Sequence, residues 1–485
     1  MSLILPKENF IFIIADQMRS DCMGCMGNPN VKTPNMDKLA AAGVIFENHY
    51  AQSPVCLPSR VSIYTGKYPR NNGSIANLVG QQASEKSFVE DLADMGYRTV
   101  SHGSNHMQPE PWGYQHLEFC ASGSDTYLDF LKHEGEYENS LKSPTHKNED
   151  LRNYEYGMYH IPAECSPDLY NAAGATKFIE NHSQEEPFFL WLGFFLPHPH
   201  YATYAPFNEL YDPDEIELFP GLSENGKLHP YLQRQKDAGA HPDVSEQVLR
   251  EITAAYYANI SLIDEGLGRV IRALEEKGSF DNTHIIFTAD HGDFTGTNGV
   301  LNKGSIPAEK LVHVPMIWKP VKKKNSPHGI RVSSYTEHVD LAPTILDLAT
   351  SDQARRCEGK SMASFLTGDT DLDKRDSAYS EICHVLYDDK SQAYDWELQS
   401  YFSSLFMDDW HYLHSLTEGD CALYNMRDDR QEQFNRIADP ECRDIYLQMK
   451  DALLNRILSN NRPAQGHDFS SWTQRNEHLS TLESS

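Results

Sequence analysis

Hydrophobic positions follow two patterns that alternate along the chain. Short runs of mostly apolar residues occur at 10–16, 97–103, 187–195, 283–289 and 314–320. Between them, apolar residues recur every three or four positions at 33–43, 88–96, 166–183, 245–278 and 338–349. The continuous runs predict strands buried on both faces, and the periodic stretches predict helices. Strands that alternate with helices indicate an α/β fold, in which helices sandwich a large, mostly parallel sheet.

The pattern changes after about residue 370. The segments SAYSEI, SYFSSLFMDDWHYLHSL and ALYNM predict shorter strands joined by turns, and residues 445–460 predict an amphipathic helix. We therefore expect an α/β domain in residues 1–370. A smaller C-terminal α+β subdomain, with a small antiparallel sheet and a helix, is expected in residues 371–485.

Composition and charge limit the classes of partner. The 485 residues include 42 Lys and Arg against 70 Asp and Glu, which gives a formal net charge of −28. A surface this acidic repels nucleic acids and anionic membranes, and neither is expected as a partner. The acidic surface is compatible with an oligomer. No apolar stretch approaches the roughly 20 residues that span a bilayer. The first apolar run is preceded only by Lys7 and followed by no small-residue cleavage site, so we expect a cytoplasmic protein.

The nine cysteines show no repeating spacing, which is typical of a reducing compartment. Cys22 and Cys25 form a C-x-x-C pair, but a zinc site needs a second such pair, so we expect two packed thiols. Cys56 lies two residues before Pro58, which suits the first turn of a helix beginning near Leu57. Residue 56 then lies at the positive end of a helix, where an anion is stabilised. A buried structural cysteine is the alternative.

Polar residues collect at the ends of the predicted strands. Because the carboxyl ends of parallel strands meet at one edge of a sheet, ligands bind there. The strand ends and the loops that follow them carry Asp16, Gln17, Ser104, Asn105, His106, His198, His200, Asp290, His291 and Lys303. Four of these residues supply carboxylate, amide and imidazole ligands for one divalent cation: Asp16, Gln17, Asp290 and His291. Oxygen ligands favour calcium, magnesium or manganese, and the imidazole shifts the preference toward manganese.

Five motifs, taken together and in this order, resemble those of the type I sulfatases of the alkaline phosphatase superfamily. They are DQ at 16–17, CLPSR at 56–60, TGKYP at 65–69, TADHG at 288–292 and ALYNMRDDRQEQFN at 422–435. The resemblance covers nearly the whole chain and lies near the phosphonate monoester hydrolase branch of that superfamily. It implies an alkaline phosphatase-like fold and an arylsulfatase-like hydrolase of sulfuric esters.

The resemblance also implies a chemical role for Cys56. In that family the cysteine of C-x-P-S-R is oxidised to formylglycine by a separate formylglycine-generating or anaerobic sulfatase-maturating enzyme. One hydroxyl of the hydrated aldehyde attacks the sulfur and the alcohol leaves. The second hydroxyl is then deprotonated, the aldehyde re-forms and sulfate is released. The implied cofactors are this formylglycine and one divalent cation, calcium first and manganese second, with Cys56 joining the four metal ligands named above.

The remaining roles follow from the resemblance position by position. Arg60 would hold the charge of the nucleophile, and Lys303 would bind the sulfate and bridging oxygens. His198 would protonate the leaving group, and His106 would assist collapse of the hydrate. Contacts to an anionic small-molecule or sugar sulfate ester are expected from Asn77, Ser104 and His200.

One position departs from the sulfatase pattern. Many sulfatases have Gly-Lys-x-His after the strand at 97–103, whereas this chain has GSNH, so Ser104 replaces a cation of the anion site. The phosphonate monoester hydrolase branch also lacks that lysine, and it has an asparagine about as far past the formylglycine as Asn77. The retained His106 favours a sulfate ester. Phosphonate monoester or phosphodiester hydrolysis is the alternative, and a metal-binding relative without catalysis is a third; aryl, sugar and choline sulfates all remain open as substrates.

Overall fold

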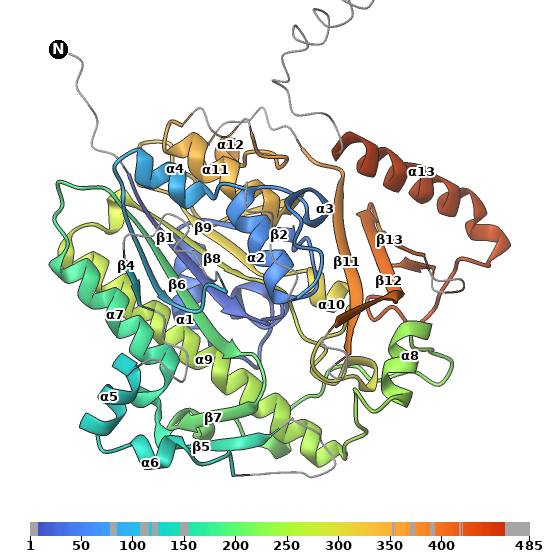
Figure 1. Ribbon diagram of the computed structural model, residues 1–485, viewed down its shortest axis with the longest axis horizontal. Coiled ribbons are helices and arrows are strands. Elements are labelled where there is room, and N and C mark those ends of the chain that lie inside the picture. Colours follow the sequence, from blue (N-terminus) through green and yellow to red (C-terminus); the bar gives the residue numbers. More distant parts are fainter. Residues whose placement is uncertain are drawn as a thin grey trace, which may run out of the picture.

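A large sheet of eight strands forms the centre of the computed structural model (Figure 1). In order across the sheet, the strands are β10 (Ile330–Glu337), β2 (Val44–Tyr50), β9 (Met316–Lys319), β8 (Thr283–Ala289), β1 (Asn9–Asp16), β6 (Phe188–Pro197), β3 (Arg98–Gly103) and β4 (His116–Glu118). Strand β9 runs antiparallel to both of its neighbours, and the other neighbouring pairs are parallel. The mostly parallel sheet predicted from the apolar runs is therefore confirmed.

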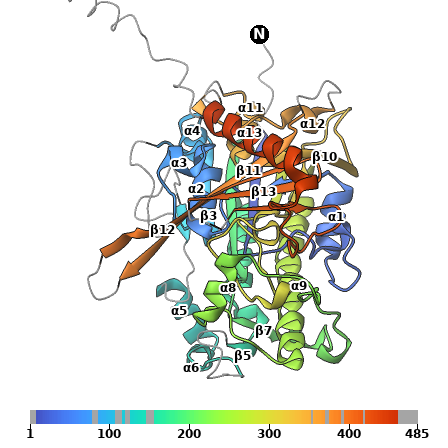
Figure 2. The ribbon, with the colours of Figure 1, turned by 90° about the vertical axis from the view of Figure 1, so that its right-hand side faces the viewer.

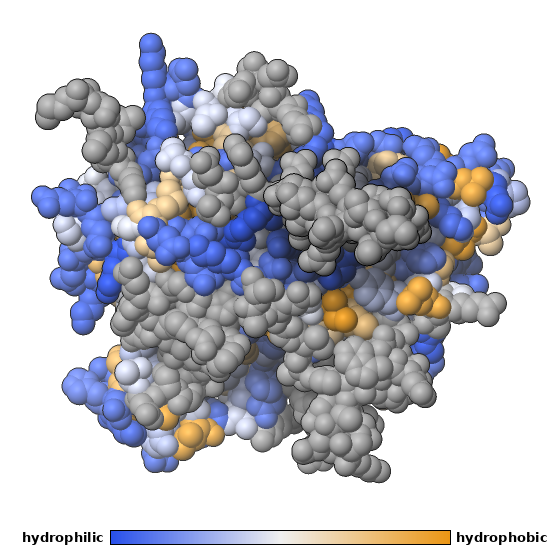
Figure 3. All heavy atoms as spheres, turned by 45° about the horizontal axis from the view of Figure 1, so that its top comes forward, coloured by the Kyte–Doolittle hydropathy of each residue, from blue (hydrophilic) through white to orange (hydrophobic). Residues whose placement is uncertain are grey.

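The structure describes residues 8–77, 85–106, 116–118, 125–145, 155–351, 354, 356–368, 374–388, 393–416, 419 and 421–460. Within these ranges no helix combines the length and the apolar character needed to cross a membrane. The cytoplasmic location stays a prediction. Figure 3 shows one face of the molecule, and among the described residues on it most are hydrophilic and the apolar ones form small separate groups, in keeping with the acidic composition.

Helices cover both faces of the sheet, which explains why β1 is apolar at consecutive positions. Phe12 and Ile14 of β1 pack on one face, and Ile11 and Ile13 pack on the other. The face of Ile11 is covered by α1 (Pro34–Ala41), α7 (Pro167–Asn181) and α9 (Glu246–Lys277). The face of Phe12 is covered by α2 (Cys56–Thr65), α4 (Phe88–Asp94), α11 (Leu341–Leu348) and α12 (Ala363–Thr367). The sandwich of helices expected from the periodic stretches is present.

A second, antiparallel sheet lies on the C-terminal side. It consists of β11 (Ser377–Asp388), β12 (Ala393–Met407), β13 (Trp410–Ser415) and β14 (Ala422–Asn425), and α13 (Arg443–Asn460) lies beside it (Figure 2). Met449 and Leu453 of α13 pack on Tyr412 of β13. This sheet and helix match the predicted α+β subdomain. The predicted boundary between residues 370 and 371 lies outside the described residues and stays a prediction.

Shorter elements complete the fold. Strands β5 (Tyr156–Pro162) and β7 (Tyr201–Ala205) form a separate parallel pair. The remaining α-helices are α3 (Pro69–Asn72), α5 (Asp125–His133), α6 (Tyr137–Ser140), α8 (Pro230–Asp237) and α10 (Glu309–Val312). Cys22 is buried, Cys25 is half-buried and both are free thiols, as predicted for a packed pair.

Candidate active site

Acidic side chains lie together where two neighbouring strands end. β1 ends at Asp16 and pairs in parallel with β8, so Ala15 lies beside Ala289, and Asp290 follows directly. The N–H of Asp290 donates to the carbonyl oxygen of Ala15 at 3.2 Å. Both carboxyl groups are buried. The parallel pairing thus brings together two carboxylates that are far apart in the sequence.

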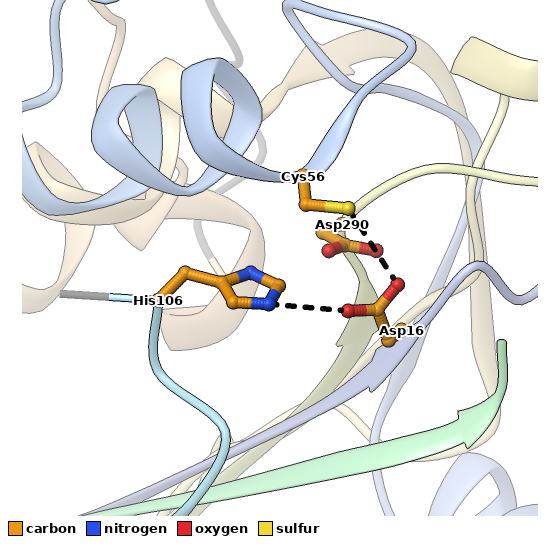
Figure 4. A group of neighbouring side chains, drawn as sticks. All are labelled: Asp16, Cys56, His106 and Asp290. Atoms are coloured by element: carbon orange, nitrogen blue, oxygen red, sulfur yellow. Dashed lines mark hydrogen bonds and ion pairs between the residues drawn. The ribbon is translucent and has the colours of Figure 1, made fainter. Parts of the chain in front are cut away.

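Cys56 is the first residue of α2, and its side chain points toward Asp16 and Asp290 (Figure 4). Its Sγ lies 3.8 Å from Oδ1 of Asp16, 3.2 Å from Nε2 of His291 and 3.0 Å from Nζ of Lys303. Burial and the Asp16 carboxylate raise the pKa of the thiol to about 12. The unmodified thiol is therefore protonated at neutral pH and is a poor nucleophile, which fits a residue that gains its reactive group by modification.

Arg60, one turn further along α2, is fully buried between these carboxylates. Its Nε donates to Oδ2 of Asp290 at 2.8 Å, its Nη2 to Oδ2 of Asp16 at 3.0 Å, and its Nη1 to the carbonyl oxygen of Ser104 at 2.9 Å. Burial alone would raise the pKa of Asp290, but Arg60, the nearby histidines and the N–H of Gln17 together hold that pKa well below its ordinary value. Arg60 therefore neutralises the carboxylates, and its action on the nucleophile stays a prediction.

Two histidines border Cys56. Nδ1 of His291 lies 2.9 Å from the carbonyl oxygen of Gly292, which places the proton on Nδ1 and leaves the Nε2 lone pair facing Cys56. Nε2 of His106 lies 3.7 Å from Oδ2 of Asp16, and its Nδ1 is buried with no hydrogen-bond partner among the described residues. Burial lowers the pKa of both histidines to about 4, so both imidazoles are neutral at pH 7.

A divalent cation fits this group of donors. The potential ligand atoms of Asp16, Cys56, His106 and Asp290 all lie within 4.8 Å of one another. Gln17 adds an amide whose Oε1 is buried with no partner among the described residues, as expected of an oxygen that binds a cation. His106 was expected to act in catalysis, and it lies in this group as well. The predicted ligand set differs from this group, because it contains Gln17 and His291 and does not contain His106. It stays a prediction.

Lys303 supplies a positive charge beside Cys56. Its Nζ lies 3.0 Å from the Cys56 Sγ and 3.3 Å from Nε2 of His291. Burial opposes the charge on this ammonium group, but the acidic groups around it, Cys56, Asp16 and Asp290, together raise the pKa of Lys303 above its ordinary value. A half-buried cation beside the N-terminus of a helix is suited to an anionic substrate.

The other predicted residues lie around this centre. Nδ1 of His198 lies 2.7 Å from the carbonyl oxygen of Pro199, and burial lowers the pKa of His198 to about 4. Nδ1 of His200 accepts from the N–H of Glu155 at 3.3 Å. Oδ1 of Asn77 accepts from the N–H of Leu57 at 3.1 Å and so caps the start of α2. Ser104 is nearly buried, and its carbonyl oxygen accepts from Arg60 and from the indole of Trp191. The substrate contacts of Asn77, Ser104 and His200 stay predictions.

The sequence did not single out Asp293, which accepts a hydrogen bond from Nε2 of Gln17. Asp293 directly follows the motif TADHG, so an acidic residue next to a recognised motif is the signal that could have identified it. Tyr201, which bonds Asp293, and Asn302, which bonds Gln17, carry no such signal.

Known proteins match the chain over most of its length. A profile of the sulfatase family matches residues 8–351, and a profile described as N-sulphoglucosamine sulphohydrolase, C-terminal, matches residues 298–459. A protein of Trinickia caryophylli, named a multifunctional alkaline phosphatase superfamily protein, is 26% identical over 478 residues, which cover 90% of this chain and 88% of that protein. An arylsulfatase of Clostridium perfringens is 27% identical over 404 residues, which cover 78% of this chain and 81% of that enzyme.

Among solved structures, the phosphonate monoester hydrolase of Agrobacterium radiobacter has a TM-score of 0.81 at 22% identity, covering 95% of this chain and 97% of that one. That likeness establishes a shared alkaline phosphatase-like fold. The match to the sulfatase profile covers most of the chain, including both strand ends and the CLPSR segment. The chain therefore belongs to the sulfatase family and is a hydrolase that acts on sulfuric esters.

Proposed function

We propose that this chain cleaves a sulfate monoester with a formylglycine made from Cys56 and one divalent cation. The observation that carries the proposal is the position of the Cys56 Sγ at the start of α2. It lies within 3.8 Å of an oxygen of Asp16, a ring nitrogen of His291 and the ammonium of Lys303. The Sγ stands in for an oxygen that the same Cβ carries after oxidation and hydration. A carboxylate, an imidazole and an ammonium group are the neighbours that such an oxygen needs.

The cation would be held by Asp16, Gln17, Asp290 and His291 together with the modified residue 56. When bound, a divalent cation acts as a Lewis acid that stabilises negative charge on the attacking and sulfate oxygens. Calcium suits the carboxylate and amide oxygens, and manganese also suits the imidazole. Arg60 holds the two carboxylates in place through its hydrogen bonds, at 2.8 Å to Asp290 and 3.0 Å to Asp16.

The other side chains would divide the work of binding and proton transfer. Lys303 neutralises the sulfate, because its ammonium group lies beside the reacting position. His198 gives a proton to the leaving oxygen; its pKa of about 4 in the free protein rises when an anionic substrate binds beside it. His106 takes the proton of the second hydroxyl, a role that fits a neutral imidazole whose buried Nδ1 has no hydrogen-bond partner among the described residues.

A second candidate function uses the same residues on a phosphonate monoester or a phosphodiester. The observation that favours it is Ser104, which stands where many sulfatases have a lysine and where the phosphonate monoester hydrolase branch lacks that lysine as well. Aryl, sugar and choline sulfates are the candidate natural esters, and residues Asn77 and His200 are the proposed substrate contacts.

The first experiment measures the mass of the Cys56 peptide from protein made in a host with a formylglycine-generating or anaerobic sulfatase-maturating enzyme. Conversion to formylglycine lowers the mass by about 18 units. The matched control is Cys165→Ala, because Cys165 is another buried free cysteine. We expect Cys165→Ala to hydrolyse an aryl sulfate like the unchanged protein and Cys56→Ala to be inactive. An unmodified Cys56 in a fully active protein would refute the mechanism, and faster cleavage of the matched aryl phosphonate would select the second function.

A further inference from the structure

Asp293 lies outside the proposed ligand set, yet its buried carboxylate is surrounded by hydrogen-bond donors. Oδ1 accepts from the N–H of Thr295 at 2.5 Å and from its hydroxyl at 2.8 Å. Oδ2 accepts from the hydroxyl of Tyr201 at 3.0 Å and from Nε2 of Gln17. Each of these partners donates, as an acceptor-only carboxylate requires.

These hydrogen bonds determine the orientation of the Gln17 side-chain amide. Nε2 of Gln17 donates to Asp293 and also to Oδ1 of Asn302 at 2.7 Å. If the amide were reversed, its oxygen would face a carboxylate that can only accept, and the contact would be repulsive. The orientation therefore leaves Oε1 of Gln17 buried without a partner among the described residues.

The same hydrogen bonds join three loops of the active site. Tyr201 follows the loop that carries His198 and His200, and its hydroxyl donates to Asp293 and accepts from the N–H of Asn302 at 2.8 Å. Asn302 directly precedes Lys303 in the chain and has a left-handed φ of 64°, which asparagine tolerates better than most residues. Gln17 belongs to the loop after β1 and also has a left-handed φ, of 67°. A change at Asp293 is therefore expected to affect the positions of Gln17, the proposed ligand, of His198, the proposed acid, and of Lys303, the proposed sulfate-binding residue.

We propose that Asp293 is the positioning residue of the cation site. Its carboxylate orients the Gln17 amide so that the amide oxygen binds the cation. Through its hydrogen bonds to Asp293 and Asn302, Tyr201 connects this carboxylate to the loops of His198 and Lys303. The inference rests on the proposed function, because it takes Gln17 to be a cation ligand. Groups that orient a metal ligand typically contribute 10- to 100-fold in metal affinity.

Asp293→Asn tests this orientation with almost no change of shape. The Asn oxygen would stay with the two donors of Thr295, so the new amide nitrogen would face Nε2 of Gln17. Two donors cannot bond, so the Gln17 amide reverses, the Asn302 amide turns to donate to its oxygen, and the Gln17 nitrogen then faces the cation. We expect calcium and manganese to bind roughly 10- to 100-fold more weakly. Tyr201→Phe removes one donor and should cost less.

A compensating pair separates positioning from general damage. Gln17→Glu alone places two carboxylates side by side, so it should bind the cation poorly despite its added charge. In the double variant Gln17→Glu with Asp293→Asn, the Asn nitrogen donates to the new carboxylate, and we expect affinity to return to at least the unchanged level. The matched control is Tyr211→Phe, which loses a buried hydroxyl bonded to Ser261 in another part of the fold.

Isothermal titration with CaCl2 and with MnCl2 on the purified full chain gives the affinities. The rise in unfolding temperature with each cation is a second readout, and neither needs catalysis. Weaker binding by Asp293→Asn, recovery in the double variant and no change in Tyr211→Phe support the inference. Equal binding by Asp293→Asn, or no recovery in the double variant, overturns it while leaving the proposed function intact. If the unchanged chain binds neither cation, the cation site of the proposed function is wrong and the inference is wrong with it.

Discussion

Removing the buried charge of Arg60 should destabilise the protein more than removing an exposed arginine. In Arg60→Met the shape of the side chain is largely kept, but Asp16 and Asp290 lose the guanidinium that lies 3.0 and 2.8 Å from their oxygens. The carbonyl oxygen of Ser104 loses a donor as well. All three charged side chains are essentially inaccessible to water, so solvent cannot replace the lost contacts.

The expected loss follows from this burial. Breaking a buried ion pair by removing one partner typically costs about 3–5 kcal/mol, because the remaining charge is left without compensation. That is a large part of the about 5–15 kcal/mol by which most domains are stable. A bound divalent cation would take over part of the role of Arg60, since it neutralises the same two carboxylates. The loss should therefore be greatest in the metal-free protein.

Urea unfolding followed by circular dichroism, in EDTA and in excess CaCl2, measures both effects. The control is Arg331→Met, because Arg331 forms an exposed pair with Glu47 at 2.9 Å. Exposed pairs contribute at most about 1 kcal/mol. We expect Arg60→Met to lose about 3–5 kcal/mol in EDTA and to gain more from calcium than the unchanged chain does. A loss as small as that of Arg331→Met, or an equal gain from calcium, would refute this account of the carboxylates.

Two further predictions concern pH and the anion site. Burial lowers the pKa of His338 from 6.5 to about 3, so the unfolded chain binds a proton that the folded chain does not. Stability should therefore fall as the pH is lowered from 6.5 toward 3, by up to about 1.4 kcal/mol per pH unit for this group. The midpoint of urea unfolding, measured between pH 7 and 4.5, should fall less steeply with decreasing pH in His338→Gln than in the unchanged chain. Equal slopes in the two proteins would contradict this. Lys303→Met should lower kcat/KM for an aryl sulfate at least about 100-fold with calcium affinity changed less than activity, measured by steady-state kinetics and titration calorimetry.

The sequence predicted those parts of the fold that have a strong apolar period. β1 and β8 are continuous apolar runs because helices cover both of their faces. β2 and β10 were not predicted. Strand β10 lies at the edge of the sheet, and its exposed polar residues Arg331 and Ser333 break its apolar signal. The direction of β9 was also unpredictable, because an antiparallel strand within a parallel sheet has the same buried pattern.

Residues of the candidate site could be predicted where they end a strand or begin a helix. Asp16, Cys56 and Asp290 were identified in this way, and the structure brings their side chains together (Figure 4). The sequence could not show that Asn77 caps α2 or that the Arg60 N–H groups bond the carboxylates. These roles depend on side-chain hydrogen bonds between segments far apart in the sequence, and no local pattern encodes them.

The guanidinium of Arg60 donates to Asp16, Asp290 and Ser104 of the protein itself rather than to a substrate. This limits the charge of the anion that the site can favour. Among the described residues, Lys303 is the lysine or arginine that hydrogen-bonds the Cys56 Sγ, and Ser104 adds no charge. Sulfate monoesters, phosphonate monoesters and phosphodiesters carry one negative charge at pH 7, whereas a phosphate monoester carries nearly two. One charged hydrogen bond is worth about 1.5–3 kcal/mol, so a phosphate monoester, whose second charge has no lysine or arginine of its own beside Lys303, should have a kcat/KM roughly 10- to 150-fold lower. Paired aryl sulfate and aryl phosphate assays test this, and Ser104→Lys should narrow the difference. Equal rates on the two esters would mean that charge does not limit this site.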